Sequence, residues 1–108
     1  MSKLISIQQA IDSMTHRFQP DKTKGVDAKY QWLISGDGGK DFCVHVNDGE
    51  FSIIEDKVEQ PTVTYKITIE DYLRLVNGEL KGMTAILTRK LIVHGNIFLA
   101  NKMDLFFK

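Results

Sequence analysis

NGELKGMTAILTRKLIVHGNIFLANK, the stretch from Asn77 to Lys102, holds more apolar residues than a closing segment of a small protein needs. Only Gly82 and the pair Gly95-Asn96 punctuate them. The spacing predicts a short helix, a strand of about four or five residues and a second helix that is apolar on nearly every side. A helix of this kind must be buried itself, or must cover something apolar.

The first half of the chain changes from a helical period to a strand period. Ser6 opens a Ser-x-x-Gln capping pattern, and apolar residues at helical spacing follow it as far as Phe18. From Tyr30 onward apolar residues recur at every second position, in three runs separated by residues 36–39 and 47–49. These glycine-rich and asparagine-rich separators accept positive φ, so they predict consecutive hairpins joining three antiparallel strands.

A further strand and helix connect the hairpins to the C-terminal stretch. The run from Val63 to Ile69 alternates like a strand, and Thr68 then caps a helix that ends near Gly78. The full order predicts an α+β fold with a single five-stranded, mostly antiparallel sheet. Residues 1–108 are expected to form one domain, because the chain is long enough for one core and too short for two.

The charge and apolar composition of the chain limits the kinds of molecule that it is expected to bind. Fourteen basic and fourteen acidic residues give a formal net charge of zero, and no run of Lys or Arg is present. Nucleic acid is therefore not an expected partner, and membrane contact is expected to be transient at most. The N-terminus lacks the pattern of a secretion signal, and no run of about 18 apolar residues occurs. A cytoplasmic location is the expectation.

Catalytic and metal-binding patterns are missing from the sequence. Cys43 is the single cysteine, and it shares a strand face with His45. Asp41 and Asn47 lie on the same face, so we expect a polar, partly solvated surface there instead of a metal or redox site. The glycines of residues 36–39 lack the Lys-Ser/Thr of a phosphate loop. The sequence predicts a protein that is not an enzyme and that needs no cofactor or metal.

The C-terminal third also resembles the signature of the sterol carrier protein 2 family, and the resemblance extends backward through residues 63–76. The residues that carry it are Gly78, Leu80, Ala85, Lys90-Leu91, Val93, Gly95-Asn96, Leu99-Ala100 and Lys102. Arg89 stands where many members have glycine, and Asn96 replaces the usual aspartate. The resemblance implies helices that cover one face of the sheet and an apolar tunnel that binds fatty-acyl chains, phospholipids or sterols.

If the tunnel exists, apolar residues of the strands and of the last third are its candidate lining. These are Trp32, Phe42, Val44, Phe51, Met83, Ile86, Leu87, Leu91, Ile97 and Met103. The final helix is the candidate gate, through Leu99, Phe106 and Phe107. Polar head groups would be met near the mouth by Lys81, Arg89, Lys90 or Lys102. The first hypothesis is therefore a lipid carrier that works by desolvation.

Periodicity alone fits a completely filled core equally well. The second hypothesis is therefore an accessory domain with a solid core, which binds a protein partner or dimerises in the service of a lipid-modifying system.

Overall fold

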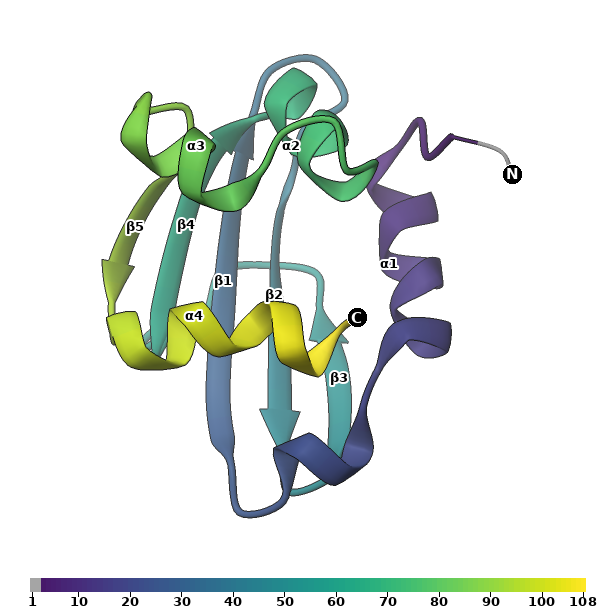
Figure 1. Ribbon diagram of the computed structural model, residues 1–108, viewed down its shortest axis with the longest axis vertical. Coiled ribbons are helices and arrows are strands. Elements are labelled where there is room, and N and C mark those ends of the chain that lie inside the picture. Colours follow the sequence, from purple (N-terminus) through teal and green to yellow (C-terminus); the bar gives the residue numbers. More distant parts are fainter. Residues whose placement is uncertain (1–2) are drawn as a thin grey trace.

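The computed structural model describes residues 3–108. Its five strands form one sheet in the order β3-β2-β1-β4-β5 (Figure 1). The strands are β1 Asp27–Ser35, β2 Asp41–Asn47, β3 Glu50–Ile54, β4 Val63–Thr68 and β5 Ile92–Gly95. β1 and β4 pair in parallel at the centre, and the other neighbouring pairs are antiparallel. The predicted five-stranded, mostly antiparallel sheet is confirmed.

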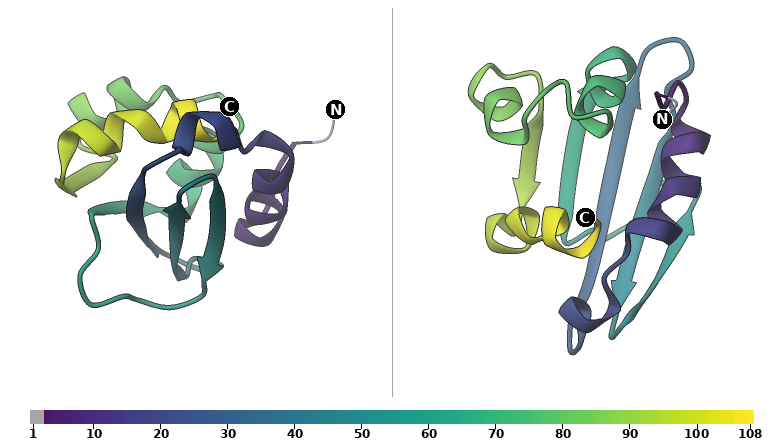
Figure 2. Two further views of the ribbon diagram at one scale, coloured as in Figure 1. Left: turned by 90° about the horizontal axis from the view of Figure 1, so that it is seen from below. Right: turned by 45° about the vertical axis from the view of Figure 1, so that its right-hand side comes forward.

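The helices lie on one face of this sheet, as predicted (Figures 1 and 2). They are α1 Ile7–Arg17, α2 Ile69–Val76, α3 Gly82–Leu87 and α4 Ile97–Phe106, with a short 3-10 helix, η1, at Pro20–Thr23. α1 lies beside the β2 and β3 side of the sheet, whereas α3 and the start of α4 lie beside the opposite edge strand, β5.

Side-chain caps set the beginnings of the three longest helices. The side-chain oxygens of Ser6, Thr68 and Asn96 each accept a hydrogen bond from a backbone amide in the first turn of α1, α2 and α4. Caps of this kind satisfy amides that have no partner within the helix. The helix starts predicted at Ser6 and Thr68 are confirmed, and Asn96 performs the same role at α4.

A two-residue turn fixes the hairpin between β2 and β3. Asn47 pairs with Glu50, and the intervening Asp48 and Gly49 have φ values of 45° and 85°. Positive φ at both central positions is the requirement of the tight hairpin turn whose twist matches the strands. The predicted hairpin is confirmed, and its register places the apolar residues of β2 and β3 toward the helices.

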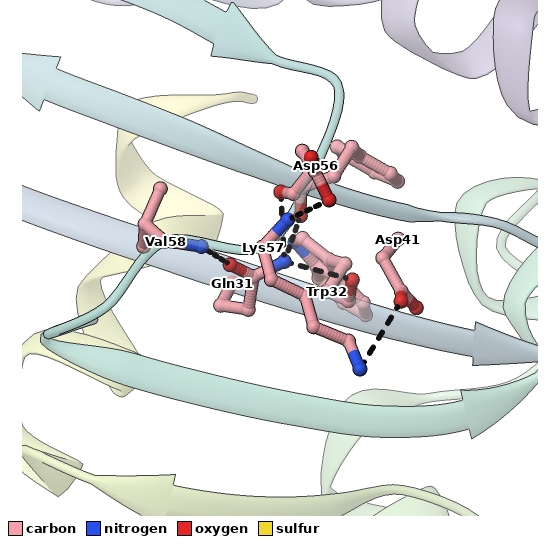
Figure 3. A network of polar contacts seen from close by, with 7 residues as sticks. Gln31, Trp32, Asp41, Asp56, Lys57 and Val58 are labelled. Carbon is pink, nitrogen blue, oxygen red and sulfur yellow. Dashed lines mark hydrogen bonds and ion pairs between the residues drawn. The ribbon is translucent and has the colours of Figure 1, made fainter.

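The segment between β3 and β4 crosses the sheet face that lies away from the helices. Gln31 of β1, which is buried, holds this segment through its side-chain amide (Figure 3). Its Nε2 donates to the carbonyl oxygens of Phe42 at 3.0 Å and Asp56 at 3.3 Å, and its Oε1 accepts from the backbone amide of Val58 at 2.8 Å. A single glutamine side chain thus anchors the segment that connects β3 to β4, and β4 then pairs with β1.

This arrangement corrects the expectation for the face that carries Cys43. Cys43 is fully buried, and it pairs with Gln31 in the register of β1 and β2. The prediction of a partly solvated surface at Cys43 was wrong, because the strand period cannot reveal that a later segment is anchored over the same face. Further along β2, His45 Nε2 lies 2.8 Å from Oδ1 of Asp27 and remains partly exposed.

Candidate functional site

Aromatic side chains form the centre of the layer between the sheet and the helices. The ring of Trp32 on β1 stacks on Tyr65 of β4, with centroids 4.2 Å apart. The ring of Tyr72 on α2 contacts the same indole edge-on, with ring centroids 5.2 Å apart. The ring centroid of Phe42 on β2 lies 6.3 Å from that of Tyr72. All four side chains are buried. Together these four residues are called the aromatic cluster below.

Two polar atoms within the aromatic cluster have no hydrogen-bond partner. Among the residues that the structure describes, nothing accepts from Nε1 of Trp32 or pairs with the hydroxyl of Tyr72. The side chains are only 6% and 1% exposed. A buried donor without a partner loses its hydration without compensation, at a cost of about 1–3 kcal/mol. Burial raises the pKa of Tyr72, and nearby Arg17 lowers it by a smaller amount, so the hydroxyl keeps its proton.

The other two tyrosines of this layer do have partners, and both partners belong to α4. The hydroxyl of Tyr30 donates to the carbonyl of Leu99 at 2.8 Å, and that of Tyr65 donates to the carbonyl of Ala100 at 3.3 Å. Burial raises the pKa of Tyr30 to about 12. These bonds tie the middle of α4 to the central strands.

A second set of contacts holds the end of α4 against α1. The rings of Phe18, Phe51 and Phe107 pack together with centroids 4.7 to 5.2 Å apart. The carbonyl of Phe106 accepts from the amide of Gln19, and the amide of Lys108 donates to the carbonyl of Arg17. The predicted gate residues Phe106 and Phe107 are therefore buried, and Leu99 is partly buried.

The predicted tunnel-lining residues divide into two groups. Six lie within or against the core: Trp32, Phe42, Val44, Phe51, Leu91 and Met103. Four lie on the outer surface of α3 and α4: Met83, Ile86, Leu87 and Ile97. The structure thus brings the strand residues together and turns most of the helix residues outward. Whether these residues line a tunnel stays a prediction.

Two surface cavities have no residue of the aromatic cluster in their walls. The first, of about 260 Å³, is bordered by Leu33, Asp41 and Lys66 at the ends of the central strands. The second, of about 220 Å³, lies between Leu4 and α2, where the backbone of Leu4 exchanges hydrogen bonds with the side chain of Asn77. Neither cavity is bordered by a residue of the predicted lining.

Two features of the site escaped sequence reasoning. The pairing of His45 with Asp27 depends on the register between β1 and β2. The unpartnered atoms of Trp32 and Tyr72 also could not be found, because a strand period identifies a buried position but not the absence of an acceptor. Within residues 3–108, no group of three His, Cys, Asp or Glu side chains is arranged to hold a metal ion.

Residues 7–108 match the SCP-2 sterol transfer family. The chain belongs to this family. Longer proteins also resemble it: hydroxysteroid dehydrogenase-like protein 2 from Bos taurus is 26% identical over 100 residues, which are 92% of this chain and 24% of that protein. The chain therefore spans about a quarter of the length of the curated relatives it matches.

Solved structures share the SCP2 fold. A double mutant of the sec-alkyl sulfatase PisA1 matches all of this chain and 17% of its own length, with a TM-score of 0.87 and 18% identity. Palmitated SCP2L2 from Aedes aegypti matches 94% of this chain and 93% of its own length, with a TM-score of 0.75 and 21% identity. At these identities the likeness establishes the fold. No helix within residues 3–108 has the length and apolar character needed to cross a bilayer.

Proposed function

We propose that this SCP2 domain, residues 1–108, is a lipid carrier that holds a fatty-acyl chain or a similar amphiphile between its sheet and α3 and α4, without catalysing a reaction. Membership of the sterol transfer family supports lipid binding, and palmitated SCP2L2 from Aedes aegypti has the same fold. The sequence-based expectation of a cytoplasmic location stays a prediction.

The observation that carries this proposal is the pair of unpartnered polar atoms in the aromatic cluster. Trp32 Nε1 can only donate a hydrogen bond, and the Tyr72 hydroxyl can donate or accept. A ligand that brings an acceptor oxygen beside these groups, such as a carboxyl, an ester or a hydroxyl, would satisfy both. Aromatic surface around them would receive the first methylenes of an alkyl chain, at about 0.8 kcal/mol per buried CH₂.

Entry of an alkyl chain requires α3 or α4 to shift from the sheet. α4 is bound to the sheet by two tyrosine hydroxyls and to α1 by the phenylalanines at its end. α3 has six residues, a length that is marginal without tertiary contacts. We infer that α3 moves more readily than α4, so that the mouth opens between α3 and the sheet.

The absence of catalysis is supported by the state of the reactive groups. The thiol of Cys43 is buried, and burial raises its pKa, which disfavours the thiolate that would act as a nucleophile. The cluster tyrosines are kept protonated by the same effect. This domain covers about a quarter of the longer relatives, so an activity of those proteins is not evidence of catalysis by this domain.

A solid-core interaction domain is the second candidate. It is favoured by the complete burial of Phe42 and Val44, and the two cavities described above are not bordered by the aromatic cluster. The two candidates differ in what amphiphiles do to stability. A carrier is stabilised by ligand according to linkage, by about 2.7 kcal/mol at a concentration one hundred times the Kd.

The experiment is a titration of delipidated protein with palmitic acid, lysophosphatidylcholine and cholesterol. Trp32 is the single tryptophan, so its fluorescence reports directly on the aromatic cluster. We expect a saturable change in emission, a rise in Tm and a one-to-one complex by native mass spectrometry for at least one of the three. If none of them changes the emission or the Tm, the carrier proposal fails and the interaction domain is favoured.

A further inference from the structure

The outer surface of α3, β5 and the first turns of α4 is unusually apolar. Nine large hydrophobic side chains are exposed in the described part of the chain, and six of them lie between residues 83 and 98. They are Met83, Ile86, Leu87, Ile92, Ile97 and Phe98. Figures 1 and 2 show α3, β5 and the start of α4 together along one edge of the sheet, on the side opposite α1. Ile92 pairs with Lys66, and the neighbouring pair Tyr65 and Val93 faces the helices, so the Ile92 side chain points to the other face of the sheet. The five residues on α3 and α4 are called the edge face.

The same stretch is the one basic region of a neutral chain. Between Leu80 and Met103 there are four basic residues and no acidic residue, so the rest of the chain holds ten basic and fourteen acidic residues. The four are Lys81, Arg89, Lys90 and Lys102. Within residues 3–108 the ion pairs involve Lys3, Lys40, His45, Lys57 and Arg74, and none involves these four.

The cations are placed around the apolar side chains. Lys102 Nζ lies 4.7 Å from the centroid of the exposed Phe98 ring. Arg89 and Lys90 follow Thr88, the C-cap residue of α3, and both are exposed. Arg89 has φ of 61°, in the left-handed region that glycine occupies without strain. A cation is therefore held at a backbone position where glycine would be less strained.

Charge decides between the occupants that an apolar surface could have. In a twofold dimer built on the edge face, four cations of one copy would lie opposite the same four of the other, which disfavours a second copy. An anionic bilayer complements both properties, because its head groups bind the cations and its upper acyl region receives the apolar side chains. Long basic side chains suit this position, since their stems lie in the apolar layer and their charges reach the head groups.

We propose that the edge face docks this protein on membranes that contain anionic lipid. Docking would place α3, which lies beside β5 at this edge of the sheet, against the bilayer. The inference does not depend on the lipid-carrier proposal, because binding to vesicles is measured without any ligand in the interior.

The test is flotation with vesicles of phosphatidylcholine alone and with vesicles of one part phosphatidylserine to three parts phosphatidylcholine. We expect binding to the anionic vesicles only, with weakening at higher salt. Replacing Lys81, Lys90 and Lys102 by Gln should weaken binding by about fivefold for each charge. Leu87→Ser with Phe98→Ser should abolish flotation, and both variants change exposed or half-exposed side chains, so their folds should be retained by circular dichroism.

The matched controls change the same residue types elsewhere. Lys22→Gln with Lys24→Gln, and Ile5→Ser, alter exposed residues away from the edge face and should leave binding unchanged. Equal binding to neutral vesicles, or equal losses in the control variants, would overturn the proposal. A dimer that Leu87→Ser with Phe98→Ser disrupts, without any vesicle binding by the parent protein, would also overturn it and assign the edge face to a second copy.

Discussion

Apolar residues are buried in strands β1 and β2, but many of them are exposed in the segment from α3 to α4. Tyr30, Phe42, Val44 and Val46 are fully buried, while Leu87, Phe98 and Met83 are 76%, 69% and 66% exposed. Both regions are similarly rich in apolar residues, so composition does not explain the difference. The strands close a core, whereas the C-terminal segment covers that core with one side and presents the other side outward. Stability should therefore depend mainly on the first region, and contact with membranes on the second.

The largest expected difference between the two regions is in the free energy of unfolding when one apolar side chain is truncated in each. Phe42→Ala leaves a void in the buried aromatic cluster and should lower the free energy of unfolding by about 3–5 kcal/mol. Leu87→Ala removes an exposed side chain and should change it by no more than about 0.5 kcal/mol. Urea denaturation followed by circular dichroism measures both. Similar losses in the two variants would mean that α3 is packed more tightly than its exposure indicates.

The next effect concerns the junction where the sheet meets α4. A Cβ added at Gly95 would collide with the carbonyl oxygen of Thr62, and the residue has φ of 106°. At Gly78 the φ is also positive, 76°, but nothing lies within 4 Å of an added Cβ. Gly95→Ala should therefore cost more than about 2 kcal/mol, against about 1 kcal/mol for Gly78→Ala. Equal urea midpoints for the two variants would show that β5 shifts to accommodate the added methyl group without a measurable cost.

A pH titration tests the three buried tyrosines, two of which join the strands to α4. Burial raises the pKa of Tyr30 from about 10 to about 12, and it raises the pKa of Tyr65 and Tyr72 as well. Between these values the unfolded chain has lost the tyrosine protons and the folded protein retains them, so stability falls as pH rises. We expect Tm to be unaffected by these groups below pH of about 9 and to drop steeply between about 10 and 12.

The control for this titration is the absorbance of tyrosinate in the folded protein. Tyr30, Tyr65 and Tyr72 are all of the tyrosines in the chain. Normal titration near pH 10 without any change in Tm would contradict the burial of their hydroxyls.

The smallest effect is the relief of backbone strain at the end of α3. Arg89→Gly removes a side chain from a position with φ of 61°, and the gain is offset in part by the greater freedom of glycine in the unfolded chain. The net gain in unfolding free energy should be below about 1 kcal/mol. The same variant should bind anionic vesicles about fivefold more weakly. A loss of stability would show that the guanidinium has a structural role.

Local signals made much of the fold predictable. The caps at Ser6 and Thr68, the turn at Asp48-Gly49 and the alternation of β1, β2 and β4 are each encoded within a few neighbouring residues. The parallel pairing of β1 with β4 and the anchoring of the crossing segment by Gln31 depend on residues 25 or more positions apart. Nothing in the period of a strand reports such contacts, and the burial of Cys43 was missed for this reason.

The candidate site was less predictable than the fold. Periodicity identified Trp32 and Phe42 as buried, but it could not show which side of α3 and α4 would meet the sheet. Met83, Ile86 and Leu87 were selected for their apolar character, and the structure places them outward. The basic character of the same segment was readable in the sequence, but the zero net charge of the whole chain concealed it.

The most direct test of the lipid-carrier proposal is the effect of Tyr72→Phe on two quantities, the unfolding free energy without ligand and the Kd for palmitate. Removing an unpartnered hydroxyl should raise the first by about 1 kcal/mol and weaken palmitate binding by about tenfold. Tyr30→Phe is the matched control. It removes a hydroxyl that already has an acceptor, so it should lower stability and leave palmitate affinity within about twofold. An unchanged Kd in Tyr72→Phe, or no palmitate binding by the parent protein, would contradict the proposal.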